Sequence, residues 1–243
     1  MKLKRFFTVL LVAVLVICTV THVVPGFSNA GSDATWVSVV KGIFPKKLSG
    51  LPELDPNSWN LILVNMENPV SQDFYVDTGI TADGYEFDAR AVEALDNLLS
   101  SGRAAGNQLV LTSAYRTYDY QTQLFEDKVF RVMNEDGADY ENAAQIAGTE
   151  VALPGTSEHQ AGLAADIVCE YYNILDEGYA DTDEAKWLIE NCADYGFILR
   201  YEKHKQDITG IIYEPWHFRY VGVEAARYIM ENDLCLEEFL ELY

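Results

Sequence analysis

The sequence runs Ser157-Glu158-His159-Gln160-Ala161-Gly162-Leu163-Ala164-Ala165-Asp166 near the middle of the chain, so a histidine and an aspartate stand seven positions apart. A second segment, Tyr213-Glu214-Pro215-Trp216-His217, adds a histidine and a glutamate near the C-terminus. Two imidazoles and one carboxylate form a ligand set typical of catalytic zinc, which leaves a fourth position open for water. The spare carboxylate beside the last ligand would take a proton from that water. Together the two segments predict a hydrolytic zinc site.

Composition limits the classes of partner. The chain has 243 residues, of which 49% are hydrophobic, enough for one domain with a substantial core. Its 38 acidic and 17 basic residues give a net charge of -21. Such an acidic surface disfavours binding to nucleic-acid phosphates and to anionic lipid headgroups. Cys169, Cys192 and Cys235 have no Cys-x-x-Cys spacing, so no thiolate metal site is predicted.

The N-terminus has the pattern of an export signal. Three basic residues among the first five precede an apolar run from Phe6 to Val20. The small residues of Ser28-Asn29-Ala30 suit cleavage after position 30. An uncleaved membrane anchor is the alternative, because Val23 and Val24 could extend the run toward the roughly 20 residues of a full span. Residues 1–30 are therefore predicted to be a signal peptide or an anchor. With either, the rest of the chain lies outside the cytoplasm, secreted or held at the outer face of the membrane.

The remaining chain divides into residues 31–57, a spacer without clear periodicity, and residues 58–243, a single domain. Apolar runs with β-branched content predict strands, and apolar residues at helical spacing predict helices. The two kinds of element are mixed without a regular βαβ alternation, which indicates the α+β class. Strands are expected over residues 60–65, 108–115, 165–169 and 197–201 and from residue 210 onward; helices are expected over residues 87–99, 116–130, 143–147 and 183–195 and from residue 223 onward.

Only two of the four histidines fit a metal site. His22 lies in the signal region, and His204 stands between two lysines, where a solvated role is expected. His159 and His217 each stand near a carboxylate in their own segment. Asp166 is followed by an apolar run that predicts burial, and a buried carboxylate needs a partner such as a cation.

Glu214 is the candidate general base. Pro215 rules out a helix through this segment. In a regular strand, residues three apart face opposite sides of the sheet. A bend or bulge near Pro215 is therefore expected, so that Glu214 and His217 both reach the metal.

Several motifs in the same order give the sequence a resemblance to the VanY-like D-alanyl-D-alanine carboxypeptidases. These are zinc enzymes of the LAS type (lysostaphin, D-Ala-D-Ala metallopeptidase, sonic hedgehog fold). The resemblance extends from about residue 60 to about residue 222, and its one small departure is Ala114, where the family often has glycine. It implies a small antiparallel central sheet flanked by helices. The motifs are Ser113-Ala114-Tyr115-Arg116-Thr117 with Gln121, the segment Ser157 to Asp166, Tyr195-Gly196-Phe197-Ile198-Leu199-Arg200-Tyr201, and Thr209-Gly210-Ile211 followed by Tyr213 to Tyr220.

The resemblance also implies roles for individual residues. Zinc would be bound by His159, Asp166 and His217, with Glu214 as general base and then acid. Arg116 matches the family's arginine that stabilises the substrate carbonyl or binds a substrate carboxylate, and a planar, permanently charged guanidinium suits either role. Three further residues match positions that line the substrate site in relatives: Gln121, Ser157 and Tyr201.

The function expected from the resemblance is removal of the terminal D-alanine from peptidoglycan stem peptides, by an extracytoplasmic enzyme with one zinc ion per chain. Two alternatives keep the fold and change the bond: an L,D-carboxypeptidase that acts on tetrapeptide stems, or a D,D-dipeptidase. A third alternative is a wall-binding module that has kept zinc and lost turnover. The presence of both Glu214 and Arg116 argues against this last alternative.

Overall fold

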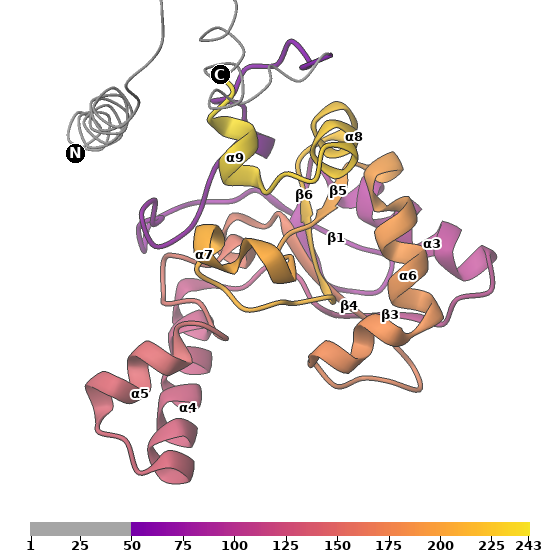
Figure 1. The fold of residues 1–243 in the computed structure, drawn as a ribbon. Coiled ribbons are helices and arrows are strands. Elements are labelled where there is room, and N and C mark those ends of the chain that lie inside the picture. The colour runs from indigo at the N-terminus through magenta and orange to yellow at the C-terminus, as the bar shows by residue number, and fades with distance from the viewer. Residues whose placement is uncertain (1–49) are drawn as a thin grey trace, which may run out of the picture. The chain divides into compact units, whose positions relative to one another are not determined.

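A computed structural model describes residues 50–243 of the chain. The predicted signal or anchor segment, and the predicted spacer up to residue 49, lie outside the described residues. Within residues 50–243, no helix has the length and apolar character needed to cross a membrane. The helices and strands of the described part, in chain order (Figure 1), are η1 (Trp59–Leu61), β1 (Thr78–Ile80), β2 (Glu86–Asp88), α3 (Val92–Ala104), β3 (Leu109–Ser113), α4 (Tyr118–Asp136), α5 (Tyr140–Ala147), η2 (Glu158–Ala161), β4 (Ala164–Cys169), η3 (Glu177–Asp181), α6 (Asp183–Asn191), η4 (Cys192–Tyr195), β5 (Phe197–Leu199), η5 (Lys203–Lys205), α7 (Gln206–Thr209), β6 (His217–Tyr220), α8 (Val223–Glu231) and α9 (Leu236–Leu240).

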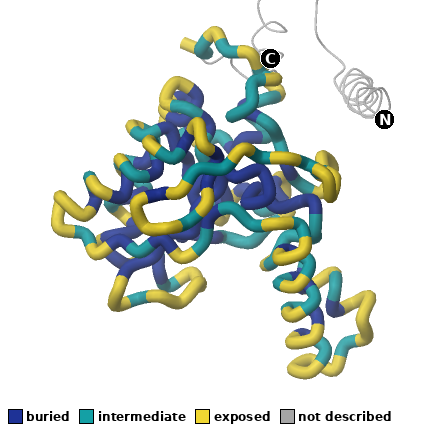
Figure 2. The backbone as a smooth tube through the Cα atoms, turned by 180° about the vertical axis from the view of Figure 1, so that it is seen from behind, coloured by how far each residue is buried: buried dark blue, intermediate teal, exposed yellow. Residues whose placement is uncertain are grey.

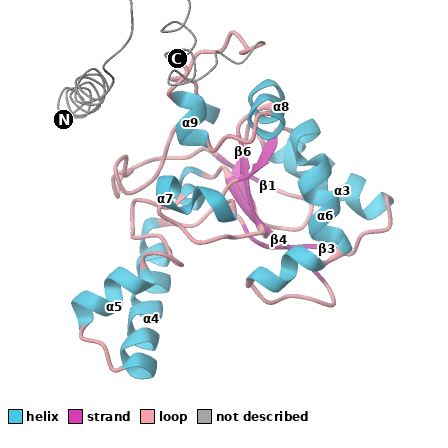
Figure 3. Ribbon diagram, viewed as in Figure 1, coloured by secondary structure: helices cyan, strands magenta, loops and turns pink. Residues whose placement is uncertain are grey.

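A four-stranded antiparallel sheet in the order β3-β4-β6-β5 lies at the centre of the domain (Figure 3). Every residue of β4 is buried, which agrees with the continuous apolar run that predicted this strand. β1 and β2 form a separate antiparallel hairpin. The predicted α+β class, with a small antiparallel sheet flanked by helices, is confirmed.

The main core lies between this sheet and its helices. It contains Leu95, Leu98 and Leu99 of α3, together with Ile167 of β4 and Phe218 of β6. Helices α4 and α5 form a hairpin with a smaller apolar cluster of its own. Figure 2 shows buried backbone through the sheet and exposed backbone toward the end of the α4–α5 hairpin. The rigid sheet is thus the part of the fold available to hold a precise site.

Three predicted elements differ from the structure. Residues 60–65 are not a strand, because the carbonyl oxygens of Asn60 and Ile62 accept hydrogen bonds from Nη2 of Arg219 instead of from a neighbouring strand. The last strand begins at His217 rather than at residue 210, because the backbone of residues 212–214 bonds to loops. The helix expected from residue 87 begins at Val92, after β2.

Candidate metal centre

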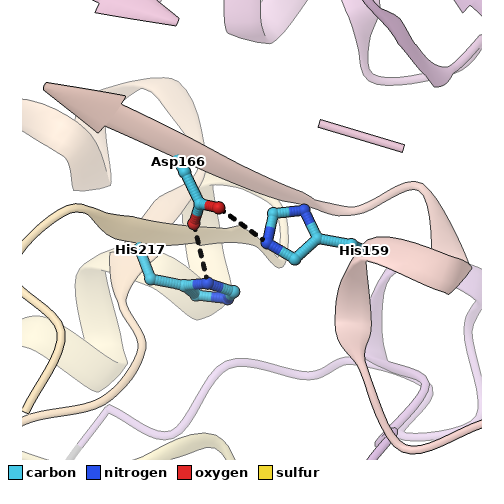
Figure 4. A group of neighbouring side chains, drawn as sticks. All are labelled: His159, Asp166 and His217. Atoms are coloured by element: carbon cyan, nitrogen blue, oxygen red, sulfur yellow. Dashed lines mark hydrogen bonds and ion pairs between the residues drawn. The ribbon is translucent and has the colours of Figure 1, made fainter. Parts of the chain in front are cut away.

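The three candidate ligands come from two strands and one turn. Asp166 lies within β4 and His217 is the first residue of β6, and the antiparallel register places them directly opposite each other. His159 lies in η2, just before β4. One ligand atom from each residue lies within 4.8 Å of the others, and all three residues are buried (Figure 4). Strand pairing therefore brings together ligands that stand 51 positions apart in sequence.

The backbone after β3 fixes the tautomer of His159. Its Nδ1 lies 2.6 Å from the carbonyl oxygen of Ala114, which can only accept, so Nδ1 carries the proton. Nε2 then presents its lone pair 3.2 Å from Oδ2 of Asp166. Burial and the nearby Arg116 guanidinium lower the pKa of His159 to about 4. The imidazole is therefore neutral at pH 7, the form that binds metals.

His217 faces the same carboxylate with Nδ1, whereas His159 does so with Nε2. Nδ1 of His217 lies 3.1 Å from Oδ1 of Asp166 and 3.6 Å from Oε2 of Glu214. Burial lowers the pKa of His217, but the hydrogen bond with Asp166 and the nearby carboxylate of Glu158 outweigh it and raise the pKa to about 9. Nδ1 is thus the atom of His217 directed at the centre, and a proton or a metal ion can occupy the space that it faces.

These donors fit a zinc ion. Zinc accepts imidazole nitrogen and carboxylate oxygen at bond lengths of roughly 2.0–2.2 Å, and tetrahedral neighbours at that length lie roughly 3.3 Å apart. The separations of 3.2 Å from Asp166 to Nε2 of His159 and 3.1 Å to Nδ1 of His217 are close to that spacing. Burial raises the pKa of Asp166, but its interactions with His159 and with the Arg116 guanidinium outweigh burial and hold the pKa well below the usual range. The carboxylate is therefore ionised and ready to bind a cation.

Glu214 reaches the centre through a turn. The backbone N–H of His217 donates to the carbonyl oxygen of Glu214 at 3.1 Å, which closes a bend around Pro215. The N–H of Glu214 itself donates to the carbonyl oxygen of Tyr201 at 3.1 Å. Burial raises the pKa of Glu214 to about 8. This carboxylate therefore binds a proton readily near neutral pH, as a general base should.

Arg116 follows β3, and its side chain donates three hydrogen bonds. Its Nη2 donates to Oδ2 of Asp166 at 2.6 Å, its Nε to Oγ of Ser113 at 2.8 Å, and its Nη1 to Oε1 of Gln121 at 3.4 Å. The side chain is 15% exposed. Arg116 also lines a cavity beside the centre, so its charge faces both the candidate ligands and any molecule bound in that cavity.

A cavity of about 350 Å³ opens onto the centre, a size typical of small-ligand sites. Ser157 and Tyr201, two of the residues predicted to lie in the substrate site, line this cavity. The ring centroids of Tyr201 and His217 lie 4.7 Å apart. Gln121 does not line it, because its side chain is fully buried and donates to the carbonyl oxygen of Ala152 at 2.7 Å. The structure places Gln121 behind Arg116, and a direct contact with substrate stays a prediction. The other walls of the cavity come from Leu124, Asp127, Lys128, Arg131, Glu150, Val151, Ala152, Leu175, Ile211, Ile212 and Trp216.

Fold and centre together define a metallopeptidase of the α+β class. The family model for VanY, D-alanyl-D-alanine carboxypeptidase, matches residues 84–223. A D-alanyl-D-alanine carboxypeptidase of Enterococcus faecalis is 41% identical over 187 residues, which cover 76% of this chain and 67% of that protein. The chain belongs to the VanY family of D-alanyl-D-alanine carboxypeptidases, and the resemblance seen in the sequence is confirmed.

Solved structures agree with this assignment. One is a variant of the D,D-pentapeptidase VanY from a VanB-type vancomycin-resistance cassette in complex with Zn(II), with a TM-score of 0.67 and 40% identity, covering 75% of this chain and 99% of that one. Another is the LD-carboxypeptidase LdcB, with a TM-score of 0.65 and 36% identity, covering 74% of this chain and 85% of that one.

The sequence-based prediction gave no role to one buried carboxylate beside the centre. Glu158 is fully buried between the cavity-lining Ser157 and the candidate ligand His159. It contacts Arg200 and Arg219, which stand 42 and 61 positions away. No local pattern in the sequence pairs residues at such distances, so the cluster could be found only in the structure.

Proposed function

We propose that this protein is an extracytoplasmic zinc carboxypeptidase that removes the terminal D-alanine from peptidoglycan stem pentapeptides. The observation that carries the proposal is the convergence of His159, Asp166 and His217 beside a raised-pKa glutamate on one cavity. Membership of the VanY family supports the reaction class, and the Zn(II) of the solved VanY variant supports the metal. The apolar segment behind the basic N-terminus supports export.

In this proposal His159, Asp166 and His217 hold the ion. When bound, zinc acidifies a water molecule and polarises the scissile carbonyl. Oε2 of Glu214, 3.6 Å from Nδ1 of His217, accepts the proton of that water and passes it to the departing amine. The Arg116 guanidinium, which lines the cavity, stabilises the negative charge that develops at the cleaved bond. Ser157 and Tyr201 line the same cavity, where they contact the peptide.

A pair of matched variants tests the base. Glu214→Gln keeps the shape of the side chain and removes the proton acceptor, so kcat should fall by about 10²–10⁴-fold while zinc content is retained. Glu150→Gln changes another carboxylate of the same cavity, one that pairs with Lys128 and is not among the three candidate ligands, and should keep most of the activity. Full activity in zinc-loaded Glu214→Gln protein would exclude Glu214 as the base.

The second candidate function is an L,D-carboxypeptidase, favoured by the likeness to LdcB. Incubation with penta-, tetra- and dipeptide substrates, with and without a chelator, separates the activities by product mass. Loss of D-alanine from the pentapeptide alone supports the proposal. Shortening of the tetrapeptide indicates the L,D-enzyme, and cleavage of the free dipeptide indicates a D,D-dipeptidase. Zinc-loaded protein that binds wall fragments and cleaves none of the three would indicate a binding module.

Export is tested separately. The mature protein should be recovered outside the cytoplasm with its N-terminus just after Ala30 if the segment is cleaved. Secreted protein that begins at Met1 would exclude cleavage, and protein found only in the cytoplasm would exclude export.

A further inference from the structure

Glu158 is held in place by two buried arginines. Its Oε1 accepts hydrogen bonds from Nε of Arg200 and from Nη1 of Arg219, both at 2.8 Å. Arg200 also donates to both oxygens of Glu237, at 2.8 and 2.7 Å, and Arg219 donates to backbone carbonyl oxygens. Because these donors approach Oε1 alone, the carboxylate is anchored by one oxygen and the other points elsewhere.

That second oxygen points toward a metal ligand. Among the described residues, three buried side-chain atoms lack a hydrogen-bond partner, and two of them are Oε2 of Glu158 and Nε2 of His217. These two atoms lie 3.7 Å apart, and both side chains are almost completely buried. An acceptor and a possible donor, each without another partner in a dry interior, carry a desolvation cost that a hydrogen bond between them would remove.

We infer that Glu158 is a positioning residue for the metal centre, whose Oε2 accepts the Nε2–H of His217 and thereby directs the Nδ1 lone pair at the ion. This inference rests on the proposed zinc site. A shift of somewhat under 1 Å closes the gap to a normal N–H···O distance. The bond fixes the tautomer of His217 and makes its Nδ1 a stronger donor, as outer hydrogen-bond partners do for metal-bound histidines. His159 has the equivalent support from the carbonyl oxygen of Ala114.

A purely structural role for Glu158 would be to balance the charges of Arg200 and Arg219. The variant Glu158→Gln separates the two roles. Since two arginine donors approach one side of the group, the amide oxygen must take that side, and the NH2 group then faces Nε2 of His217. Two donors would confront each other, which disfavours the required tautomer while keeping the arginines bonded.

The matched control is Glu237→Gln. Glu237 pairs with the same Arg200, at 2.7 Å, and its other side-chain hydrogen bond is with Asn65. A charge-balancing role for the cluster predicts similar effects of the two variants, since each removes one negative charge beside Arg200. The positioning role predicts that only the change at Glu158 weakens zinc binding.

The experiment measures zinc affinity by competition with a chromophoric chelator, and histidine tautomers by long-range ¹H–¹⁵N NMR of the zinc-loaded full chain. Glu158→Gln should weaken zinc affinity about 10–100-fold, and Glu237→Gln should change it less than about threefold. Equal affinities for both variants and the wild type would overturn the inference. Neither measurement depends on turnover.

The NMR measurement on the wild type keeps the inference testable if Glu158→Gln does not fold. The spectrum should show His217 protonated at Nε2, with this proton protected from exchange. Protonation at Nδ1 instead, with the metal on Nε2, would overturn the inference and leave the proposed function standing. Wild-type protein that binds no zinc would overturn the proposed function, and this inference with it.

Discussion

Zinc binding is expected to displace a proton from His217, so that zinc affinity rises steeply with pH. Burial lowers the pKa of His217, but its hydrogen bond with Asp166 and the nearby carboxylate of Glu158 prevail and raise the pKa to about 9. Nδ1 cannot hold a proton and a metal ion at once, so the proton must leave. His159 contributes no proton at neutral pH, because its pKa is about 4.

The size of the effect follows from these values. At pH 7, two units below the pKa of about 9, roughly 99% of His217 carries the proton. Competition with that proton weakens zinc binding roughly 100-fold, or about 3 kcal/mol. Glu214, with a pKa of about 8, is roughly 90% protonated at pH 7, and a nearby dication favours its ionised form. Between one and two protons should therefore leave per ion bound at pH 7.

Isothermal titration calorimetry in buffers with different ionisation enthalpies counts these protons, and chelator competition gives the Kd at each pH. The Kd should fall at least about tenfold per pH unit between pH 7 and the pKa of His217. Glu214→Gln should reduce the count at pH 7 to about one, because an amide has no proton to lose. A Kd that stays constant from pH 7 to pH 9, with no proton released, would refute the raised pKa of His217.

Three further outcomes are expected. The metal-free protein should lose thermal stability between pH 6.5 and pH 9 in scanning calorimetry. Because the pKa of His217 is raised in the folded state, protonated His217 stabilises the fold fully below pH 6.5, and this contribution is lost above about pH 9. A constant Tm over this range would contradict the prediction. Arg116→Lys should retain zinc and lose about 100-fold in kcat/KM by steady-state kinetics, because an ammonium cannot reproduce the forked contacts; an unchanged value would exclude a role in charge stabilisation. Gly162→Ala should lower the free energy of unfolding in urea by about 1–3 kcal/mol, because φ is +68° there and the new Cβ would lie 2.9 Å from Cγ1 of Val76; equal stability would show that the turn relaxes.

The hydrophobic periodicity of the sequence located the elements that form the core. The apolar run at residues 165–169 predicted β4, which is buried throughout, and Gly196, directly after the helix predicted over residues 183–195, adopts a left-handed conformation. The failures concern segments whose polar groups find distant partners. Residues 60–65 look like a strand, but Arg219 takes two of their carbonyl oxygens, a contact across 157 or more positions. No local pattern contains that information.

For the candidate site too, the sequence predicted some features and could not predict others. Residue types and the two histidine segments indicated which side chains would hold a metal, because few combinations serve that chemistry. The sequence could not reveal the register that sets Asp166 opposite His217. Nor could it reveal that Gln121 lies behind Arg116 rather than in the cavity wall, or that Glu158 approaches Nε2 of His217. These relations depend on tertiary packing between elements far apart in the chain.

The titration of Glu214 links the metal to the base. With a pKa of about 8, Glu214 in the metal-free protein is mostly protonated at pH 7 and cannot accept a proton. An arriving dication that displaces the protons of Glu214 and His217 leaves the net charge of the pocket unchanged. That exchange avoids burying additional charge, which would be costly in a low-dielectric interior. Zinc is therefore expected to bring Glu214 into its ionised, basic form.

Infrared difference spectroscopy measures this change directly. At pH 7 the metal-free protein should show the carbonyl stretch of a protonated carboxyl group, and the band should disappear when zinc is added. Glu214→Gln should lack the band from the start, whereas Glu150→Gln should keep it, because that carboxylate pairs with Lys128 at the cavity wall. A band that persists in the zinc-loaded wild type would show that Glu214 stays protonated beside the ion, and some other group would then have to accept the proton.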